Sequence, residues 1–236
     1  MSGSRESAPS AAPIVVLDYG MGNIHSMVKA LRLFADEVVY TNDPGAIQNC
    51  RALVLPGDGA FAAAMQNIAG DLQQQLLDFV AAGRPLLGVC IGFQILFEDS
   101  DEAISPEANS QDAGTATLLT RGLGVIPGRI RRFQFAPPAP EDGAAPVRVP
   151  HMGWNTLLYT GEAATQHTGD HMYFIHSYRA QDVPAANVIA RCNYAGDVFP
   201  AIVKNDAGNV LATQFHPEKS DRPGLELIKE WVSALA

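Results

Sequence analysis

The sequence predicts a single-domain α/β protein, with a central and mostly parallel sheet covered by helices on both faces. Short, continuously apolar runs alternate with stretches of helical periodicity through the first half of the chain. The composition, 47% apolar and 17% charged over 236 residues, is that of a globular chain able to bury one large core. Strand-like runs dominate the second half, where they predict an antiparallel extension of the sheet.

The first half supplies the expected alternation of strands and helices. Residues 13–18 form an apolar strand that ends in the turn Tyr-Gly-Met-Gly-Asn, and residues 24–34 then place apolar side chains at helical spacing. Gly83 provides a C-terminal stop for the helix that precedes it. Further strands are expected at 37–40, 52–55 and 85–89, and further helices at 60–69, 71–82 and 93–97.

The second half is less regular. Residues 99–117 are acidic and aperiodic and residues 136–146 are rich in Pro and Ala, so we interpret both as surface insertions. Residues 1–12, rich in Ser, Ala and Pro, are expected to be a disordered extension, which leaves 13–236 as the domain. Short strand-like runs lie at 129–135, 147–149, 155–159, 172–178, 187–193, 199–204 and 210–215, and an amphipathic helix at 223–235 closes the chain.

Charge and cysteine content argue against several classes of function. A net charge of -9, with only 16 Lys and Arg, argues against a nucleic-acid partner. The one basic cluster, at 129–132, is interpreted as a solvated face, with contact to an acidic partner surface as the alternative. Three widely spaced cysteines fit reduced thiols in a cytoplasmic protein, and no apolar run approaches the ~20 residues of a membrane span. We expect no metal and no cofactor.

A candidate nucleophile, Cys90, follows the strand at 85–89. Gly88-Val89-Cys90-Ile91-Gly92 has the form of a nucleophile elbow, in which small flanking residues let a strand turn sharply into a helix. The thiol would lie at a helix N-terminus, whose partial positive charge favours the reactive thiolate. The alternative is that Cys90 is a small buried core residue, and the pentapeptide by itself does not decide between the two.

A thiolate that attacks an amide needs an acid or base for the leaving group, and a partner that orients it. His216 and Glu218 supply both types, and in an extended segment residues two apart lie on the same side of the chain. A lone histidine after a strand is more often structural. The His-Pro-Glu triplet together with the elbow reverses that preference and predicts a Cys-His-Glu triad.

Acyl transfer also needs hydrogen-bond donors for the oxyanion that develops on the substrate. The backbone N–H of Ile91, which follows the nucleophile, can supply one donor. The turn Pro-Gly-Asp-Gly at 56–59 ends the neighbouring strand, so Asp58 and Gly59 can supply another. The alternative is an ordinary glycine turn.

Three segments resemble the signatures of the class I (triad) glutamine amidotransferases, and the resemblance extends over residues 13–235. These segments are Pro-Gly-Asp-Gly-Ala-Phe, Gly-Val-Cys-Ile-Gly-Phe-Gln and Gln-Phe-His-Pro-Glu-Lys-Ser. Within that family the chain is most similar to the glutaminase subunits of imidazole glycerol phosphate synthase. The segments that select this group lie at 18–23, 150–155, 173–178 and 219–220.

The resemblance implies a flavodoxin-like amidotransferase fold and the hydrolysis of L-glutamine at Cys90 through a thioester. The ammonia would pass to a (β/α)₈-barrel cyclase subunit, the other half of a heterodimer. That subunit makes imidazole glycerol phosphate and aminoimidazole carboxamide ribotide in histidine biosynthesis. Such a barrel needs about 200 or more residues, so this chain cannot hold one as well. The family keeps the isolated glutaminase weak, and we expect a peptide flip at 56–59 to be the switch.

The resemblance also assigns site residues. Gly59 and Gln94 match positions that hold the glutamine, and Ser177 with Tyr178 match the segment that closes over its α-amino and carboxylate ends. Positions near the cyclase interface are matched by Asn23, Trp154, Asn155 and Lys219. The alternatives are a core aromatic for Trp154, a solvated charge for Lys219 and satisfied structural histidines for His151 and His176.

Two positions depart from the family pattern. Asp58 stands where an apolar residue is usual, in the loop expected to form the oxyanion hole. A carboxylate there would oppose negative charge, so we expect its side chain to point away or to be paired. Phe93 replaces the more common Met before Gln94, which conserves bulk.

Three other functions compete with this interpretation. The first is a glutaminase for anthranilate, aminodeoxychorismate or pyridoxal phosphate synthesis, against which the segment at 150–155 argues. The second is a catalytically silent regulatory subunit, which would not need the complete triad. The third is a nucleotide binder that uses the turn at 20–22, which lacks the full dinucleotide fingerprint.

Overall fold

The computed structural model describes residues 12–22, 24–102, 119–136, 146–161 and 169–235. The extension expected at 1–12 and the insertions expected at 99–117 and 136–146 lie almost wholly outside these residues. In the part that is described, no helix is long and apolar enough to cross a membrane.

The centre of the fold is one large twisted sheet, whose described strands follow the order β2-β1-β3-β4-β13-β12-β11-β8-β9. The first five are parallel and the remaining four are antiparallel to their neighbours. The parallel strands are β2 (Val38–Thr41), β1 (Ile14–Leu17), β3 (Ala52–Leu55), β4 (Leu86–Val89) and β13 (Val210–Thr213). The antiparallel strands are β12 (Asp197–Lys204), β11 (Val188–Tyr194), β8 (His151–Tyr159) and β9 (His171–His176). This confirms the predicted mostly parallel sheet with an antiparallel extension.

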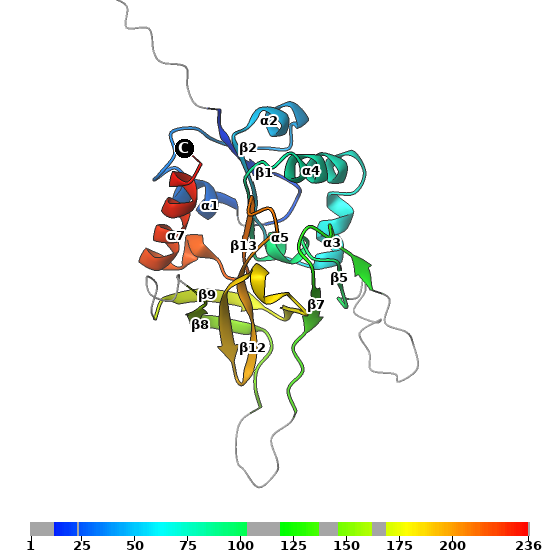
Figure 1. Ribbon diagram of the computed structural model, residues 1–236, viewed down its shortest axis with the longest axis vertical. Coiled ribbons are helices and arrows are strands. Elements are labelled where there is room, and N and C mark those ends of the chain that lie inside the picture. Colours follow the sequence, from blue (N-terminus) through cyan, green and yellow to red (C-terminus); the bar gives the residue numbers. More distant parts are fainter. Residues whose placement is uncertain (1–11, 23, 103–118, 137–145, 162–168, 236) are drawn as a thin grey trace, which may run out of the picture.

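Helices cover both faces of the parallel half, because its strands are apolar on both sides. Val15 and Leu53 pack on the face covered by α2 (Pro44–Asn49), α3 (Phe61–Asn67), α4 (Asp71–Ala81) and α5 (Ile91–Gln94). Ile14 and Val54 pack on the opposite face, against α1 (Ile24–Leu31) and α7 (Asp221–Ser233). Figure 1 shows α1 and α7 on one side of the sheet and α2, α3 and α4 on the other.

A second sheet stands beside the central one and has the order β10-β7-β5-β6. Its described strands are β10 (Tyr178–Gln181), β7 (Arg129–Arg132), β5 (Asp99–Ser100) and β6 (Thr120–Arg121). The prediction of a single strand at 172–178 was therefore wrong. The chain breaks at Ser177, so β9 completes the central sheet and β10 begins the second one.

Other element boundaries also differ from expectation. Helix α2 was missed, although Asp43 caps it by accepting a 2.8 Å hydrogen bond from the Ala46 N–H and Pro44 opens it. No strand forms at 147–149, where Val147 is exposed. Two short 3₁₀ turns, η2 (Ala185–Asn187) and η3 (Pro217–Lys219), complete the described elements.

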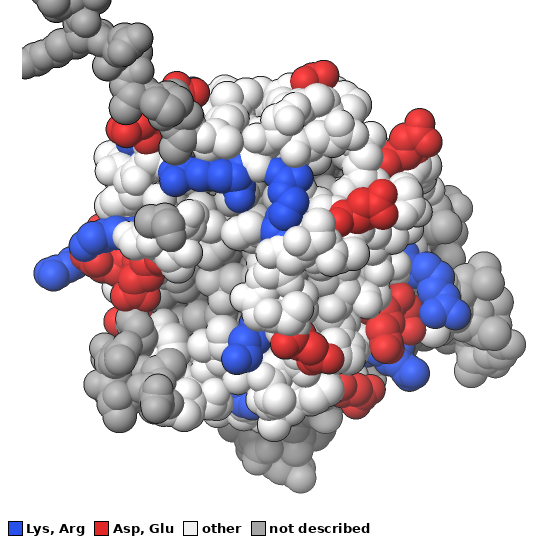
Figure 2. Space-filling model, turned by 45° about the horizontal axis from the view of Figure 1, so that its top comes forward, with Lys and Arg blue, Asp and Glu red and all other residues white. Residues whose placement is uncertain are grey.

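Charged side chains are dispersed over the surface. Figure 2 shows Lys and Arg interspersed with acidic residues on the visible face and not gathered in one patch. In the second sheet Asp99 pairs with Arg131 at 2.7 Å and with Arg129 at 3.9 Å. The basic cluster of the sequence is therefore partly neutralised within the protein, while the Arg132 side chain stays exposed.

Among the described glycines, Gly92, where β4 turns into α5, leaves the least room for a Cβ. A Cβ on Gly92 would overlap with the carbonyl oxygen of Leu55 at the end of β3, and a Cβ on Gly88 would stand 2.8 Å from the Gly92 oxygen. Phe93 follows immediately and is fully buried in the core. The two glycines thus let α5 start directly against the sheet.

Gly92→Ala should lower the free energy of unfolding by about 3 kcal/mol, because backbone atoms cannot make room for the methyl group. Urea denaturation followed by circular dichroism measures this loss. Gly45→Ala in α2 is the control, since its Cβ would meet only the end of the Asp43 side chain, at 3.2 Å. Equal stability of the two variants would contradict the proposed close approach.

Candidate active site

Cys90 occupies the sharp turn between β4 and α5. Its backbone has φ 55° and ψ -103°, a strained conformation for a residue with a side chain. Its N–H donates a 2.8 Å hydrogen bond to the Thr213 carbonyl at the end of β13, which anchors the turn to the neighbouring strand. The thiol, nearly buried, lies 3.9 Å from the carbonyl oxygen of Ile175 on β9. The turn therefore has the geometry of a nucleophile elbow.

His216 and Glu218 come from the segment that follows β13. The His216 N–H donates to the Tyr173 carbonyl at 3.0 Å, and Nδ1 lies 2.8 Å from Oε1 of Glu218. Residues 217–219 form the turn η3 rather than the extended segment that was expected, and this turn brings the carboxylate to the ring. Because Nδ1 is occupied, the buried Nε2 remains for the thiol of Cys90.

The protonation of His216 is set by competing effects. Burial lowers the pKa of the imidazole, whereas hydrogen bonding with Cys90 and Glu218, together with the charges of both, raises it. The second group of effects prevails, so the pKa lies well above its usual value. An imidazolium beside Cys90 favours the thiolate, the nucleophilic form of the side chain.

The loop at 56–59 packs against the start of α5. Gly57 and Gly59 have φ values of 145° and 123°, which residues with a side chain rarely adopt. The Tyr19 hydroxyl donates a 2.6 Å hydrogen bond to the Pro56 carbonyl, which fixes the start of the loop. Within the described part of the chain, the N–H groups of Ile91 and Gly59 donate no hydrogen bond to another residue. Both are therefore available to a ligand.

The side chain of Asp58 turns towards the loop between β1 and α1. Its Oδ1 lies 2.5 Å from the place that a Cβ on Gly22 would occupy, so the carboxylate packs closely against this glycine. Its charge also contributes to the raised pKa of Tyr19, whose largest cause is burial. Asp58 still borders the cavity in front of Cys90, with its carboxylate directed at this loop.

A cavity of about 290 Å³ opens in front of the thiol. It brings together seven of the residues expected from sequence, namely Asp58, Gly59, Cys90, Ile91, Gln94, Ser177 and Lys219. Glu102, Pro150, Ile175 and His176 complete its wall. The side-chain nitrogen of Gln94 donates to the Tyr178 carbonyl at 3.2 Å and to Gln214 Oε1 at 3.1 Å. Tyr178 thus contributes to the site through its carbonyl group.

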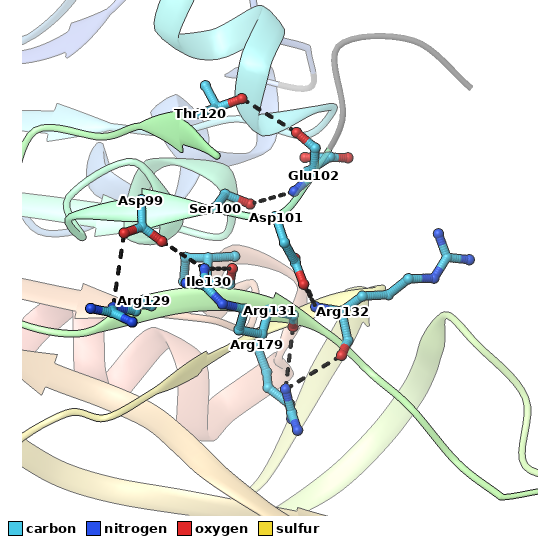
Figure 3. A network of polar contacts seen from close by, with 10 residues as sticks. All are labelled: Asp99, Ser100, Asp101, Glu102, Thr120, Arg129, Ile130, Arg131, Arg132 and Arg179. Carbon is cyan, nitrogen blue, oxygen red and sulfur yellow. Dashed lines mark hydrogen bonds and ion pairs between the residues drawn. The ribbon is translucent and has the colours of Figure 1, made fainter. Parts of the chain in front are cut away.

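Glu102 was missed from the sequence, because it lies in the acidic segment interpreted as an insertion. Figure 3 shows how the second sheet holds it: its N–H donates to Ser100 Oγ at 3.1 Å, and its carbonyl accepts from Thr120 Oγ1 at 3.4 Å. Its carboxylate accepts from the Phe61 N–H at 2.5 Å. Burial raises the pKa of Glu102 above its usual value, because it disfavours the ionised carboxylate. A cation in the cavity would stabilise that ionised form.

The residues expected at a partner interface have different surroundings. Trp154 is 53% exposed on β8, with its ring edge-on to Tyr173 at 6.0 Å, so it is not a core aromatic. Asn155 turns its amide inward, donating to the Asn193 carbonyl at 2.9 Å. Lys219 borders the cavity. Asn23 lies outside the described residues.

Solved structures share this fold. A crystal structure of a glutamine amidotransferase superposes with a TM-score of 0.64 over 93% of this chain and 98% of that chain, at 20% identity. A structure of PurLQS from Thermotoga maritima superposes with a TM-score of 0.61 over 95% of this chain and 97% of that chain, at 18% identity. At these identities the likeness concerns the fold alone.

Sequence comparisons extend the likeness beyond the fold. The family described as glutamine amidotransferase class-I matches residues 15–234. Imidazole glycerol phosphate synthase subunit HisH of Halobacterium salinarum is 42% identical over 227 residues, which cover 95% of this chain and 94% of that protein. The HisH subunit of Geobacter sulfurreducens is 37% identical over 222 residues, which cover 92% and 97% respectively. The chain therefore belongs to the class I glutamine amidotransferase family and, within it, to the HisH subunits of imidazole glycerol phosphate synthase.

Proposed function

We propose that this chain hydrolyses L-glutamine to glutamate and ammonia as the glutaminase subunit of an imidazole glycerol phosphate synthase, an enzyme of histidine biosynthesis. The observation that carries the proposal is the strained turn that places Cys90 at the cavity, together with the coupled pair His216 and Glu218, whose imidazole is influenced by Cys90. Nucleophile, proton carrier and orienting carboxylate are the groups that amide hydrolysis requires.

The chemistry runs in two halves. The Cys90 thiolate attacks the side-chain carbonyl carbon of glutamine, and the N–H groups of Ile91 and Gly59 bind the oxyanion. The C–N bond breaks as the His216 imidazolium gives its proton to the leaving nitrogen, which releases ammonia and leaves a thioester. Water then attacks the thioester, His216 accepts its proton, and the C–S bond breaks, which releases glutamate and regenerates the Cys90 thiolate and the His216 imidazolium.

Substrate recognition requires groups for the charged head of glutamine. The Glu102 carboxylate is the acidic group on the cavity wall suited to the α-ammonium group, because it is partly buried, its pKa is raised by burial and an opposite charge would stabilise its ionised form. Gln94 and Ser177 border the same cavity and offer polar groups to the rest of the molecule. The Asp58 carboxylate, directed towards Gly22, is left out of this role.

The proposal includes a cyclase partner in a heterodimer, since the relatives are named as subunits of a synthase. The exposed Trp154 and Met152 on β8, and Lys219 at the cavity, are the residues we assign to that contact. The loop at 56–59 would be the regulatory element, because its glycines allow a peptide flip that makes or breaks the oxyanion hole. A cytoplasmic location agrees with three free cysteines.

Ammonia release should require both Cys90 and the cyclase. The assay combines the purified chain, the nucleotide substrate of the cyclase or an analogue, and the cyclase barrel itself. Cys90→Ala should reduce the rate to below about a thousandth, because no other group can form the thioester. Cys192→Ala, in the core of the antiparallel extension, is the matched control.

The other outcomes are equally informative. Release that depends on Cys90 but not on this cyclase would assign the chain to another synthase, such as that for anthranilate. No release in any mixture would favour a silent regulatory subunit. Equal rates with and without the cyclase and its substrate would exclude the switch at 56–59.

Glu218→Gln should shift the alkaline limb of the profile of kcat/KM against pH to lower pH. Removing the carboxylate charge takes away part of what raises the pKa of His216, so the imidazolium loses its proton earlier as the pH rises. The rate at the optimum should fall roughly 100-fold or more. Glu226→Gln, in an exposed pair with Lys229, should leave the profile unchanged. An unshifted alkaline limb in Glu218→Gln would count against the coupling.

Glu102→Gln should raise the KM for glutamine about tenfold or more with a much smaller effect on kcat, since the charge binds the substrate head and not the reacting amide. Steady-state kinetics over a range of glutamine concentrations separates the two parameters. A fall in kcat at constant KM would place Glu102 outside substrate binding.

A further inference from the structure

Two buried histidines border the active site without a part in the proposed chemistry. His151 on β8 and His176 on β9 stand directly opposite each other in the antiparallel pairing and are 2% and 6% exposed. Nδ1 of His151 lies 3.0 Å from Nε2 of His176. His176 also forms part of the cavity wall.

The hydrogen bonds of this pair run in one direction. Nδ1 of His176 lies 2.8 Å from the Tyr178 carbonyl oxygen, which can only accept, so Nδ1 carries the proton. In a neutral ring Nε2 of His176 is then an acceptor, and Nδ1 of His151 must donate to it. Nε2 of His151 is left as an acceptor and lies 3.3 Å from the amide nitrogen of Asn155. Along this chain of hydrogen bonds, from Asn155 to Tyr178, every donor is thus paired with an acceptor.

The surroundings keep both rings neutral. Burial lowers the pKa of His151 to about 4. Burial also lowers the pKa of His176, and the charges of His151, His216 and Arg179 lower it further, although its hydrogen bond to Tyr178 acts in the other direction. The His151 ring stacks on Tyr194 with centroids 4.1 Å apart. A protonated ring would interrupt the sequence of donors and acceptors, and this environment disfavours it.

The inner end of the chain of hydrogen bonds reaches the substrate cavity. The Tyr178 carbonyl that accepts from His176 also accepts from the Gln94 side chain, at 3.2 Å. Ser177 lies between His176 and Tyr178, at the point where the chain leaves the central sheet for the second one. His176 and Gln94 therefore share one acceptor, and Ser177 is the residue next to His176 in the chain. The outer end, Asn155, lies beside the exposed Trp154.

We propose that Asn155, His151 and His176 form an oriented hydrogen-bond relay that positions Gln94 and Ser177 for glutamine. His151 and His176 are positioning residues in this arrangement, because they act through the Tyr178 carbonyl. The relay rests on the proposed glutaminase function for its purpose, while its tautomers can be measured without any substrate.

Nitrogen-15 NMR of the uniformly labelled protein tests the relay directly. Both histidines should carry the proton on Nδ1 and stay uncharged from about pH 6 to 8, whereas exposed histidines favour the proton on Nε2 and titrate near pH 6.5. His151→Asn and His176→Asn assign the signals. Asn155→Leu, which removes the outer donor, should shift the His151 Nε2 resonance. Proton on Nε2 of either ring, or titration of either ring above pH 6, would overturn the relay.

Kinetics tests what the relay does. His176→Leu removes one of the two donors to the Tyr178 carbonyl and should raise the KM for glutamine about tenfold, because Gln94 then shares its acceptor with no second donor that fixes it, with kcat changed far less. His176→Asn keeps a donor near the position of Nδ1 and should stay within about threefold of the wild type. The rate of Cys90 alkylation by iodoacetamide should be the same in both variants. His171→Leu, on the exposed side of β9, should leave KM unchanged.

The two proposals fail in different ways. Equal KM values for His176→Leu and wild type, or equal losses in His176→Leu and His176→Asn, would overturn the positioning role. A wild-type chain without glutaminase activity, but with both protons on Nδ1, would overturn the proposed function and leave the relay standing. If His176→Leu does not fold, Asn155→Leu takes its place, with a smaller rise in KM expected in the same direction.

Discussion

The contact between Gly92 and the end of β3 is the constraint on which the rest of the site depends. There is no room for a side chain between α5 and the sheet at Gly92. Because glycine has none, α5 can begin directly after Cys90. The cost is a strained backbone at Cys90, which the hydrogen bond to Thr213 helps to hold. This geometry directs the thiol towards β9 and leaves the Ile91 N–H without a helical acceptor.

Two buried histidines near one cavity have opposite protonation preferences, and their immediate partners explain why. A carboxylate 2.8 Å from His216 favours the imidazolium and offsets the cost of burial. His176 has a carbonyl and a second imidazole as partners, with Arg179 as a cationic neighbour, so the hydrogen bond to Tyr178 offsets only part of that cost. The same residue type is thus favoured as an imidazolium at one position and as a neutral ring at another.

The cavity exists because the chain divides between two sheets at Ser177. Strand β9 brings Ile175 and His176 from the central sheet to one side, while the segment that follows β5 brings Glu102 from the second sheet to the other side. Each wall is held by its own strand pairing, and Figure 3 shows the polar contacts that surround Glu102 in the second sheet. A ligand between the walls would therefore be held by groups that need little reordering on binding.

The sequence alone determined the parallel sheet, the sharp turn at Cys90 and the candidate triad. The apolar strands, the glycines that surround Cys90 and the His-Pro-Glu triplet can each be recognised from a few consecutive residues. What only the tertiary structure decided depends on distant pairing. Residues 172–178 form one apolar run, yet Ser177 ends a strand because β7 takes up the chain beyond it. Glu102 belongs to an acidic segment whose strand is too short for periodicity, and His151 meets His176 only through the register of β8 and β9. Such contacts are set by packing over the whole fold, which no short segment encodes.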